Sequence, residues 1–166
     1  MLTHRLGGGR LALVFCVRYV PVSIPAFGRS YKMELLRNVP LFRTLSQRHL
    51  SAVAKYTDAH RARQGAILTK KGQHGLEAFV IVDGRARVEV GGKTIAELGV
   101  GDFVGELSLI DGKPRTATVI AQTPMTLLVV RRRDFKSLRD TVPGLQEKLL
   151  TTLCERLRQA DQALTH

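Results

Sequence analysis

The spacing of apolar residues changes twice along the chain and divides it into three parts. Between Glu34 and about Tyr56 apolar residues recur at helical intervals that Pro40 interrupts, which predicts short helices. From Ala66 to Val130 the pattern changes to short runs rich in β-branched residues, separated by glycine, which predicts strands. The predicted strands cover 78–82, 86–90, 94–98, 116–121 and 125–130, with tight turns at Asp83-Gly84 and Gly91-Gly92. Many short strands with close turns favour an antiparallel sandwich or roll over a parallel α/β sheet.

The helical period returns after Arg133. Pro143 is expected to end a short helix, and Gly144 to open a longer one. On the longer helix, apolar residues step by three and four at Leu150, Leu153, Leu157, Ala160 and Leu164. Two interpretations of this stripe stay open, because it suits packing on the domain's own sheet and the seam of a dimer equally well.

Residues 1–32 differ in composition from the rest of the chain. They contain three consecutive glycines and an apolar run over 11–17 that is too short to span a bilayer. A signal peptide fits less well, because Arg18 interrupts the apolar run and no clear small-residue cleavage site follows. We therefore expect a disordered extension or a start codon assigned too early, followed by one domain over 33–166 that begins at Met33.

The chain is basic, with a net charge of +12 over 166 residues. Such a field attracts anionic nucleotides and also nucleic acid. However, Arg131-Arg132-Arg133 falls at a predicted strand-to-helix junction, where a solvated basic turn is the simpler interpretation. We expect no specific nucleic-acid binding.

The two cysteines, Cys16 and Cys154, are far apart and lack the spacing of a metal site. Cys154 falls in a helical pattern and is expected to be a small buried apolar residue. These features fit a reduced compartment, so we predict a cytoplasmic protein without membrane association.

The segment 105–118 carries the strongest chemical signal. Gly105 permits a close backbone approach to a ligand, and backbone N–H groups at the start of a short helix can bond phosphate oxygens. Arg115 offers a planar fork of donors that suits phosphate. Glu106 carries a carboxylate, an acceptor that suits a ribose hydroxyl. Alone, Glu106 and Arg115 would be interpreted as a surface ion pair, but their place in this ordered segment favours a phosphorylated-sugar site.

This order of residues resembles the phosphate-binding cassette of cyclic nucleotide-binding domains, the ligand-sensing β-rolls of catabolite activators, cyclic-nucleotide-dependent kinases and cyclic-nucleotide-gated channels. The family pattern is Phe-Gly-Glu-Leu-small-Leu, a variable turn, then Pro-Arg, a small or hydroxyl residue, Ala and a hydroxyl residue. Val104 departs from the pattern, with Phe103 one position earlier. The likeness extends from about Glu34 to Asp161. It implies an α+β, mainly β fold, namely an antiparallel, jelly-roll-like β-roll of about eight strands with short N-terminal helices and a long C-terminal helix.

The resemblance also implies a ligand and its contacts. The ligand-binding residues would be Gly105, Glu106, Leu107, Ser108, Arg115, Thr116 and Ala117, and packing residues of the cassette would be Leu107, Leu109 and Val119. The implied ligand is cyclic AMP, with cyclic GMP as the alternative, and no metal or further cofactor. Bacterial activators contact adenine through two hydroxyl residues of the long helix. The matching positions here are Ala160 and Asp161, which supply no hydroxyl, so the base preference stays open.

These features predict a regulatory domain that senses a cyclic nucleotide, acts on a separate effector protein through its C-terminal helices, and has a possible homodimer seam on the long helix. The alternative is a ligand-free dimerisation or interaction module on the same fold. We expect no enzyme activity, because the five histidines are scattered and Ser108 has no histidine at a motif-like spacing. His49 and His60 are expected on or near helix surfaces. The activators' helix-turn-helix would follow the long helix, and the sequence stops at His166, so a stand-alone domain is expected.

Overall fold

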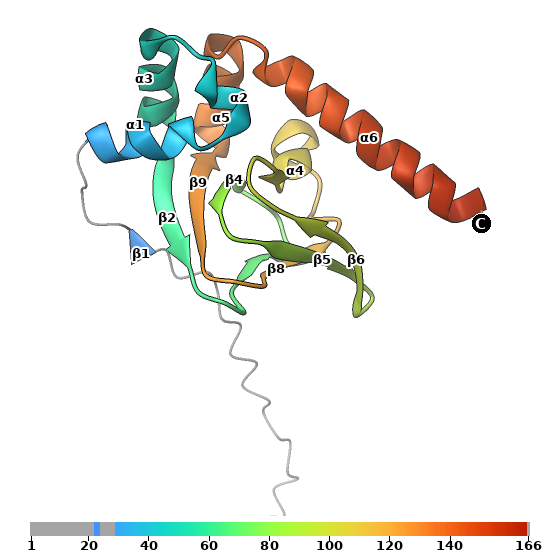
Figure 1. Cartoon of the computed structure of the whole chain (residues 1–166). Helices are drawn as coiled ribbons and strands as arrows, with labels where there is room; N and C mark the ends of the chain where they lie inside the picture. Colours follow the sequence, from blue (N-terminus) through green and yellow to red (C-terminus); the bar gives the residue numbers. More distant parts are fainter. Residues whose placement is uncertain (1–21, 24–28, 166) are drawn as a thin grey trace, which may run out of the picture.

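The computed structural model describes residues 22–23 and 29–165, which form a β-roll with most of the helices gathered at one end (Figure 1). In chain order the elements are β1 (Val22–Ser23), α1 (Arg29–Arg37), α2 (Pro40–Arg43), α3 (Gln47–Tyr56), β2 (Asp58–Ala62), β3 (Ile67–Thr69), β4 (Glu77–Asp83), β5 (Ala86–Val90), β6 (Lys93–Leu98), β7 (Phe103–Val104), α4 (Glu106–Asp111), β8 (Thr118–Ala121), β9 (Met125–Arg131), α5 (Arg132–Thr141) and α6 (Leu145–Thr165).

Two antiparallel sheets make up the roll. One has the strand order β1-β2-β9-β4-β7, and the other has the order β3-β8-β5-β6. Apolar side chains such as Phe79, Ile81 and Leu127 form the core between them. The antiparallel β-roll with short N-terminal helices and a long C-terminal helix, predicted by resemblance, is confirmed.

Strand β4 is buried on both faces. Phe79 and Ile81 belong to the core between the sheets, whereas Val80 and Val82 belong to a second core built with α1, α2, α3 and α5. This double burial explains why 78–82 is a continuous apolar run in the sequence, since a strand covered on one face only would alternate. The helices thus complete the fold by covering the outer face of one sheet.

The N-terminal helices agree with the predicted pattern. Pro40 opens α2, and Ser46 caps α3 by accepting a hydrogen bond from the His49 backbone N–H at 3.3 Å. Lys32 Nζ on α1 donates to the carbonyl oxygens of Ala54 (2.9 Å) and Thr57 (2.6 Å), which ties α1 to the end of α3. Of the extension predicted over residues 1–32, residues 1–21 and 24–28 lie outside the described residues.

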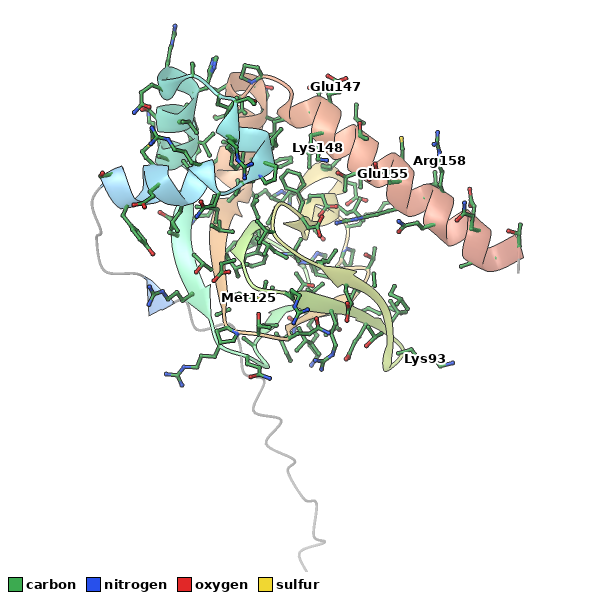
Figure 2. The ribbon with its side chains drawn as sticks, viewed as in Figure 1. Lys93, Met125, Glu147, Lys148, Glu155 and Arg158 are labelled. Carbon is green, nitrogen blue, oxygen red and sulfur yellow. The ribbon has the colours of Figure 1, made fainter. Side chains whose placement is uncertain are left out.

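The long helix α6 begins against the helical core and then extends away from it (Figure 1). Leu145 and Leu149 are buried, but three residues further along the predicted stripe are exposed: Leu150 (56%), Leu157 (63%) and Leu164 (86%). The interpretation that this stripe packs on the domain's own sheet is therefore wrong, and the dimer seam stays a prediction. Cys154 is also exposed, contrary to the prediction of a buried residue, because α6 extends away from the helical core after Leu149. Charged residues of the exposed helix, such as Glu155 and Arg158, are labelled in Figure 2.

Strand β2 was not predicted, and its position corrects the assignment of His60. This histidine is 8% exposed and pairs in register with Leu127 of β9, so it lies within the sheet and not near a helix surface. Burial lowers the pKa of its imidazole.

Within the described residues, none of the helices combines the length and apolar character needed to cross a membrane.

Candidate functional site

The segment that carries the chemical signal forms a turn and a short helix after β7. Gly105 adopts a left-handed conformation (φ 78°) and stands at the N-terminal cap of α4. A second left-handed glycine, Gly112 (φ 70°), ends the helix. Both positions favour glycine, because a Cβ atom disfavours positive φ. The chain then returns through Arg115 to β8, which brings the arginine back beside Gly105.

Arg115 is held by main-chain carbonyls on two sides. The residue is 9% exposed, and its Nη1 donates to the Gly105 oxygen at 2.6 Å while its Nη2 donates to the Glu77 oxygen at 2.5 Å. These bonds use two of the five N–H donors of a guanidinium, so the group retains capacity for an anion. Burial lowers the pKa of Arg115, and the charges of Glu106 and Glu77 oppose that change. The guanidinium is thus fixed in position by groups other than a ligand.

Glu106, the first residue of α4, is 2% exposed and pairs with Arg156, which was not predicted from the sequence as a site residue. Arg156 on α6 donates from Nη1 to Glu106 Oε1, and from Nη2 to the Phe103 oxygen at 2.8 Å. Burial raises the pKa of the Glu106 carboxyl, and the nearby Arg156 opposes the rise. Arg156 therefore connects the carboxylate expected to bind ribose with the C-terminal helix.

The remaining predicted ligand residues surround these groups. Ser108 is buried (3% exposed), whereas Thr116 is exposed, and the Ala117 oxygen accepts from Thr69 Oγ1 at 3.2 Å. The packing expected of Leu109 and Val119 is confirmed, since both are buried. The same expectation is wrong for Leu107, which is 36% exposed because it lies on the outer side of the short helix.

Ala160 and Asp161, the positions matched to base contacts, are exposed on α6 beyond Arg156. The structure therefore brings together Gly105, Glu106 and Arg115 but leaves these two residues apart from any enclosed site. Their exposure follows from the direction of α6, which continues past the roll (Figure 1).

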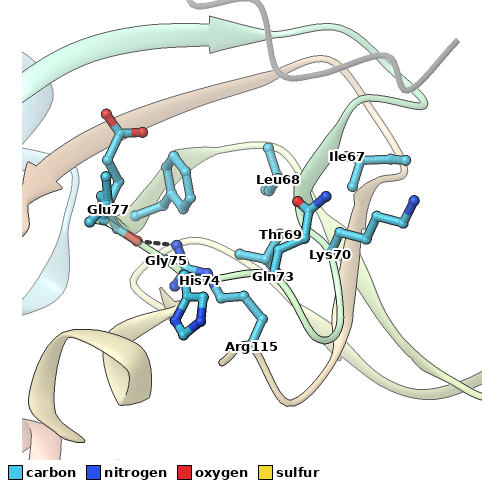
Figure 3. A pocket seen from close by; sticks show the side chains of 11 residues that line it. Ile67, Leu68, Thr69, Lys70, Gln73, His74, Gly75, Glu77 and Arg115 are labelled. Carbon is cyan, nitrogen blue, oxygen red and sulfur yellow. Dashed lines mark hydrogen bonds between the residues drawn. The ribbon is translucent and has the colours of Figure 1, made fainter. Parts of the chain in front are cut away.

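A cavity of about 400 Å³ borders Arg115 on the side of β3 and the loop that follows it. Figure 3 shows the arginine among residues of this loop, with the dashed bond to Glu77. The cavity is lined in part by Thr69, Gln73 and His74, and Arg115 is the one cassette residue among those lining it. This loop was not predicted from the sequence as part of the site, because its glycines and polar residues match an ordinary turn.

The basic run after β9 has a structural role. The strand ends at Arg131 and α5 begins at Arg132, as predicted for a strand-to-helix junction. The Arg132 backbone N–H donates to the Leu76 oxygen at 2.8 Å, and Arg131 forms a 3.6 Å pair with Asp58.

Among the described residues, no group of three or more His, Cys, Asp or Glu is placed to hold a metal ion.

Comparisons with known proteins agree with the fold and identify a family. The sequence model of the family described as cyclic nucleotide-binding domain matches residues 59–141. A cyclic nucleotide-gated potassium channel of Rhizobium etli is 37% identical over 151 residues, which are 91% of this chain and 41% of the channel. The cyclic AMP receptor protein of Thermus thermophilus is 30% identical over 134 residues, which are 78% of this chain and 62% of that protein.

A solved structure of PKAR CBD2 bound to Sp-2Cl-cAMPS shares the fold, with a TM-score of 0.70 at 24% identity, over 81% of this chain and 90% of that one. The chain spans less than two thirds of the length of the Rhizobium and Thermus relatives, which carry further segments. The match to the family model over residues 59–141 establishes that the chain belongs to the cyclic nucleotide-binding domain family.

Proposed function

We propose that this domain senses cyclic AMP and regulates a separate effector protein through its C-terminal helices. The observation that carries the proposal is the convergence of Arg115, Gly105 and Glu106 in a member of a family of cyclic nucleotide-binding domains. Arg115 supplies positive charge and directional donors, and Glu106 supplies an acceptor for a sugar hydroxyl. The cyclic phosphate and the ribose are thereby recognised by different side chains.

In the proposed complex the Arg115 guanidinium holds the cyclic phosphate together with backbone N–H groups of the Gly105 turn and the cassette. Its bonds to the carbonyls of Gly105 and Glu77 orient the side chain in advance, so little conformational freedom is lost when the anion binds. Ser108 and Ala117 line the cassette, and Thr116 is exposed and available to the phosphate or the base.

In this proposal, Arg156 couples nucleotide binding to the position of α6. Arg156 donates to Glu106 Oε1, and Oε2 of the same carboxylate is a further acceptor for a ribose hydroxyl. A ribose that shares or replaces the arginine contact changes what holds α6 near the cassette. Pro143 and Gly144, which separate α5 from α6, form the hinge about which the long helix moves. A ligand shifts this arrangement only if it binds one position of α6 more tightly than another.

We propose cyclic AMP as the ligand, ahead of cyclic GMP, because the similar protein of Thermus thermophilus is a cyclic AMP receptor protein. Cyclic GMP is the alternative, since Ala160 and Asp161 offer no hydroxyl to select adenine. The exposed leucines of α6 support a homodimer seam, and the effector is a separate protein. No catalytic residue is assigned. A ligand-free interaction module is less well supported, because it gives no role to the buried Glu106 and Arg115.

Isothermal titration calorimetry of the full chain with cyclic AMP, cyclic GMP and 5′-AMP tests the proposal. We expect saturable binding of a cyclic nucleotide and at least about tenfold weaker binding of 5′-AMP, whose open, more highly charged phosphate does not match the cassette. Tighter binding of cyclic GMP than of cyclic AMP would correct the ligand. A folded protein that binds neither would contradict the sensor and favour the ligand-free module.

A further inference from the structure

Gly75 lies in the loop between β3 and β4, directly against the Arg115 side chain (Figure 3). A Cβ atom built on Gly75 would stand 2.5 Å from Arg115 Nη2 and nearer still to Cζ and Nε. The backbone at Gly75 does not have a positive φ, so its conformation alone does not require glycine. The space that Arg115 occupies does require it.

We propose that Gly75 is a positioning residue for the phosphate-binding arginine, an inference that rests on the proposed function. By lacking a side chain, Gly75 leaves room for the guanidinium to reach the carbonyls of Gly105 and Glu77. Gly105 flanks the same guanidinium, where a Cβ would lie 3.0 Å from Cζ, but its left-handed backbone is a second reason for glycine there. Gly75 is the position at which the requirement is steric alone.

The loop that carries Gly75 is held in place at three points. The Gly72 N–H donates to the Arg115 oxygen and the Arg115 N–H donates to the Gln73 oxygen, both at 2.8 Å. The Leu76 oxygen accepts from the Arg132 N–H, also at 2.8 Å. A methyl group at position 75 therefore cannot be accommodated by moving the loop without breaking main-chain hydrogen bonds.

Of the two partners in this contact, the Arg115 side chain is the one that an added methyl group can displace. A guanidinium at the end of a flexible stem can rotate away from an added methyl group, whereas the loop cannot. We therefore expect Gly75→Ala to fold with Arg115 displaced from its two carbonyl partners. The variant keeps the arginine and its charge but loses the orientation that a bidentate phosphate contact needs.

The test is a double-mutant cycle in the full chain, with cyclic AMP and cyclic GMP as probes and calorimetry as the measurement. We expect Gly75→Ala to weaken binding by at least about tenfold in the wild-type background and by less than about twofold in the Arg115→Ala background. Gly99→Ala is the matched control, because Gly99 also lacks a positive φ and a Cβ there would meet no atom within 4 Å. The control is expected to bind as the wild type does.

Two results would overturn the positioning role while leaving the sensor intact. One is wild-type affinity in Gly75→Ala, and the other is an equal loss of affinity with and without Arg115. Wild-type protein that binds neither nucleotide would instead contradict the proposed function. In that case the contact itself is tested by the NMR resonance of Arg115 Nε–H. The resonance should shift in Gly75→Ala and not in Gly99→Ala, and an unshifted resonance would overturn the steric inference.

Discussion

The cassette and the outer half of α6 differ in how fully each is built before a ligand arrives. In the cassette, Glu106 and Arg115 are almost wholly buried, and each forms a hydrogen bond with a polar partner. On α6, by contrast, Leu157 and Leu164 are 63% and 86% exposed. Buried side chains that are already hydrogen-bonded keep their positions whether or not a ligand is bound. A helix that packs on little else is free to change position. Under the proposed function, we therefore expect the cassette to set nucleotide affinity and α6 to carry the response, with Arg156 as the link.

Removal of the Arg115 side chain should have the largest effect. Under the proposed function, Arg115→Ala deletes a charge-assisted contact to the cyclic phosphate, and we expect a loss of about 3 kcal/mol in binding, roughly a hundredfold in Kd. Calorimetric titration measures it. Lys113→Ala removes an exposed cation two residues away and should leave Kd within about twofold, which separates a specific contact from general charge. An equal loss of nucleotide affinity in the two variants would show that Arg115 contributes only general positive charge and would contradict a specific contact.

Truncation of Arg156 should affect the response more than the affinity. Arg156→Ala removes the connection between α6 and Glu106, and leaves a buried carboxylate without that donor, at about 1–3 kcal/mol of folding stability. The exposed Cys154, labelled with an environment-sensitive fluorophore in a Cys16→Ser background, reports the position of α6. We expect the nucleotide-induced change in fluorescence to disappear while binding persists. A preserved change would place the link elsewhere. Arg158→Ala, on an exposed part of the same helix, is the control.

Protonation of Glu106 should give a smaller, pH-dependent effect. Burial raises its pKa in the folded state, so between the unfolded and the folded pKa the native protein binds more protons than the unfolded chain. The contribution of Glu106 to stability is therefore present below its ordinary pKa and declines as pH rises through the folded value. Urea unfolding of wild type and Glu106→Gln at several pH values tests this. The stability of the wild type relative to the variant should fall with rising pH, and a rise would reverse the sign assigned to burial.

A charge placed in the leucine stripe should have the smallest effect on the ligand site. Leu157→Glu is expected to leave nucleotide affinity within about twofold, because the residue is exposed and lies outside the cassette. If α6 forms a dimer seam, light scattering should show that Leu157→Glu shifts the protein towards the monomer. Gln159→Glu adds the same charge on another side of the helix and should not. Identical molar masses for all three proteins would contradict the seam.

Features set by neighbouring residues could be predicted from the sequence. The cassette is a contiguous segment, so the order of Gly105, Glu106 and Arg115 is enough to bring them close together in the fold. The strand predicted over 86–90 coincides with β5, because its β-branched residues and flanking turns act locally.

Features set by distant residues could not be predicted in this way. Arg156 and Glu106 are 50 positions apart, and nothing near either residue identifies its partner. Gly75 looks like an ordinary turn glycine until Arg115 is placed beside it. Strand β2 has few apolar residues and owes its conformation to pairing with β9, so its His60 was misplaced. The exposure of Cys154 depends on the direction in which α6 leaves the fold.

The hydrogen bond from the Arg132 N–H to the Leu76 oxygen has a consequence for kinetics. This amide belongs to the first residue of α5, yet its partner is in the loop that packs on Arg115. Hydrogen exchange at this amide therefore reports how often the loop opens. If nucleotide binding stabilises the loop, the Arg132 amide should exchange more slowly in the complex. The exchange rate of an amide in the first turn of α5 would then measure how often the loop beside the proposed phosphate site opens.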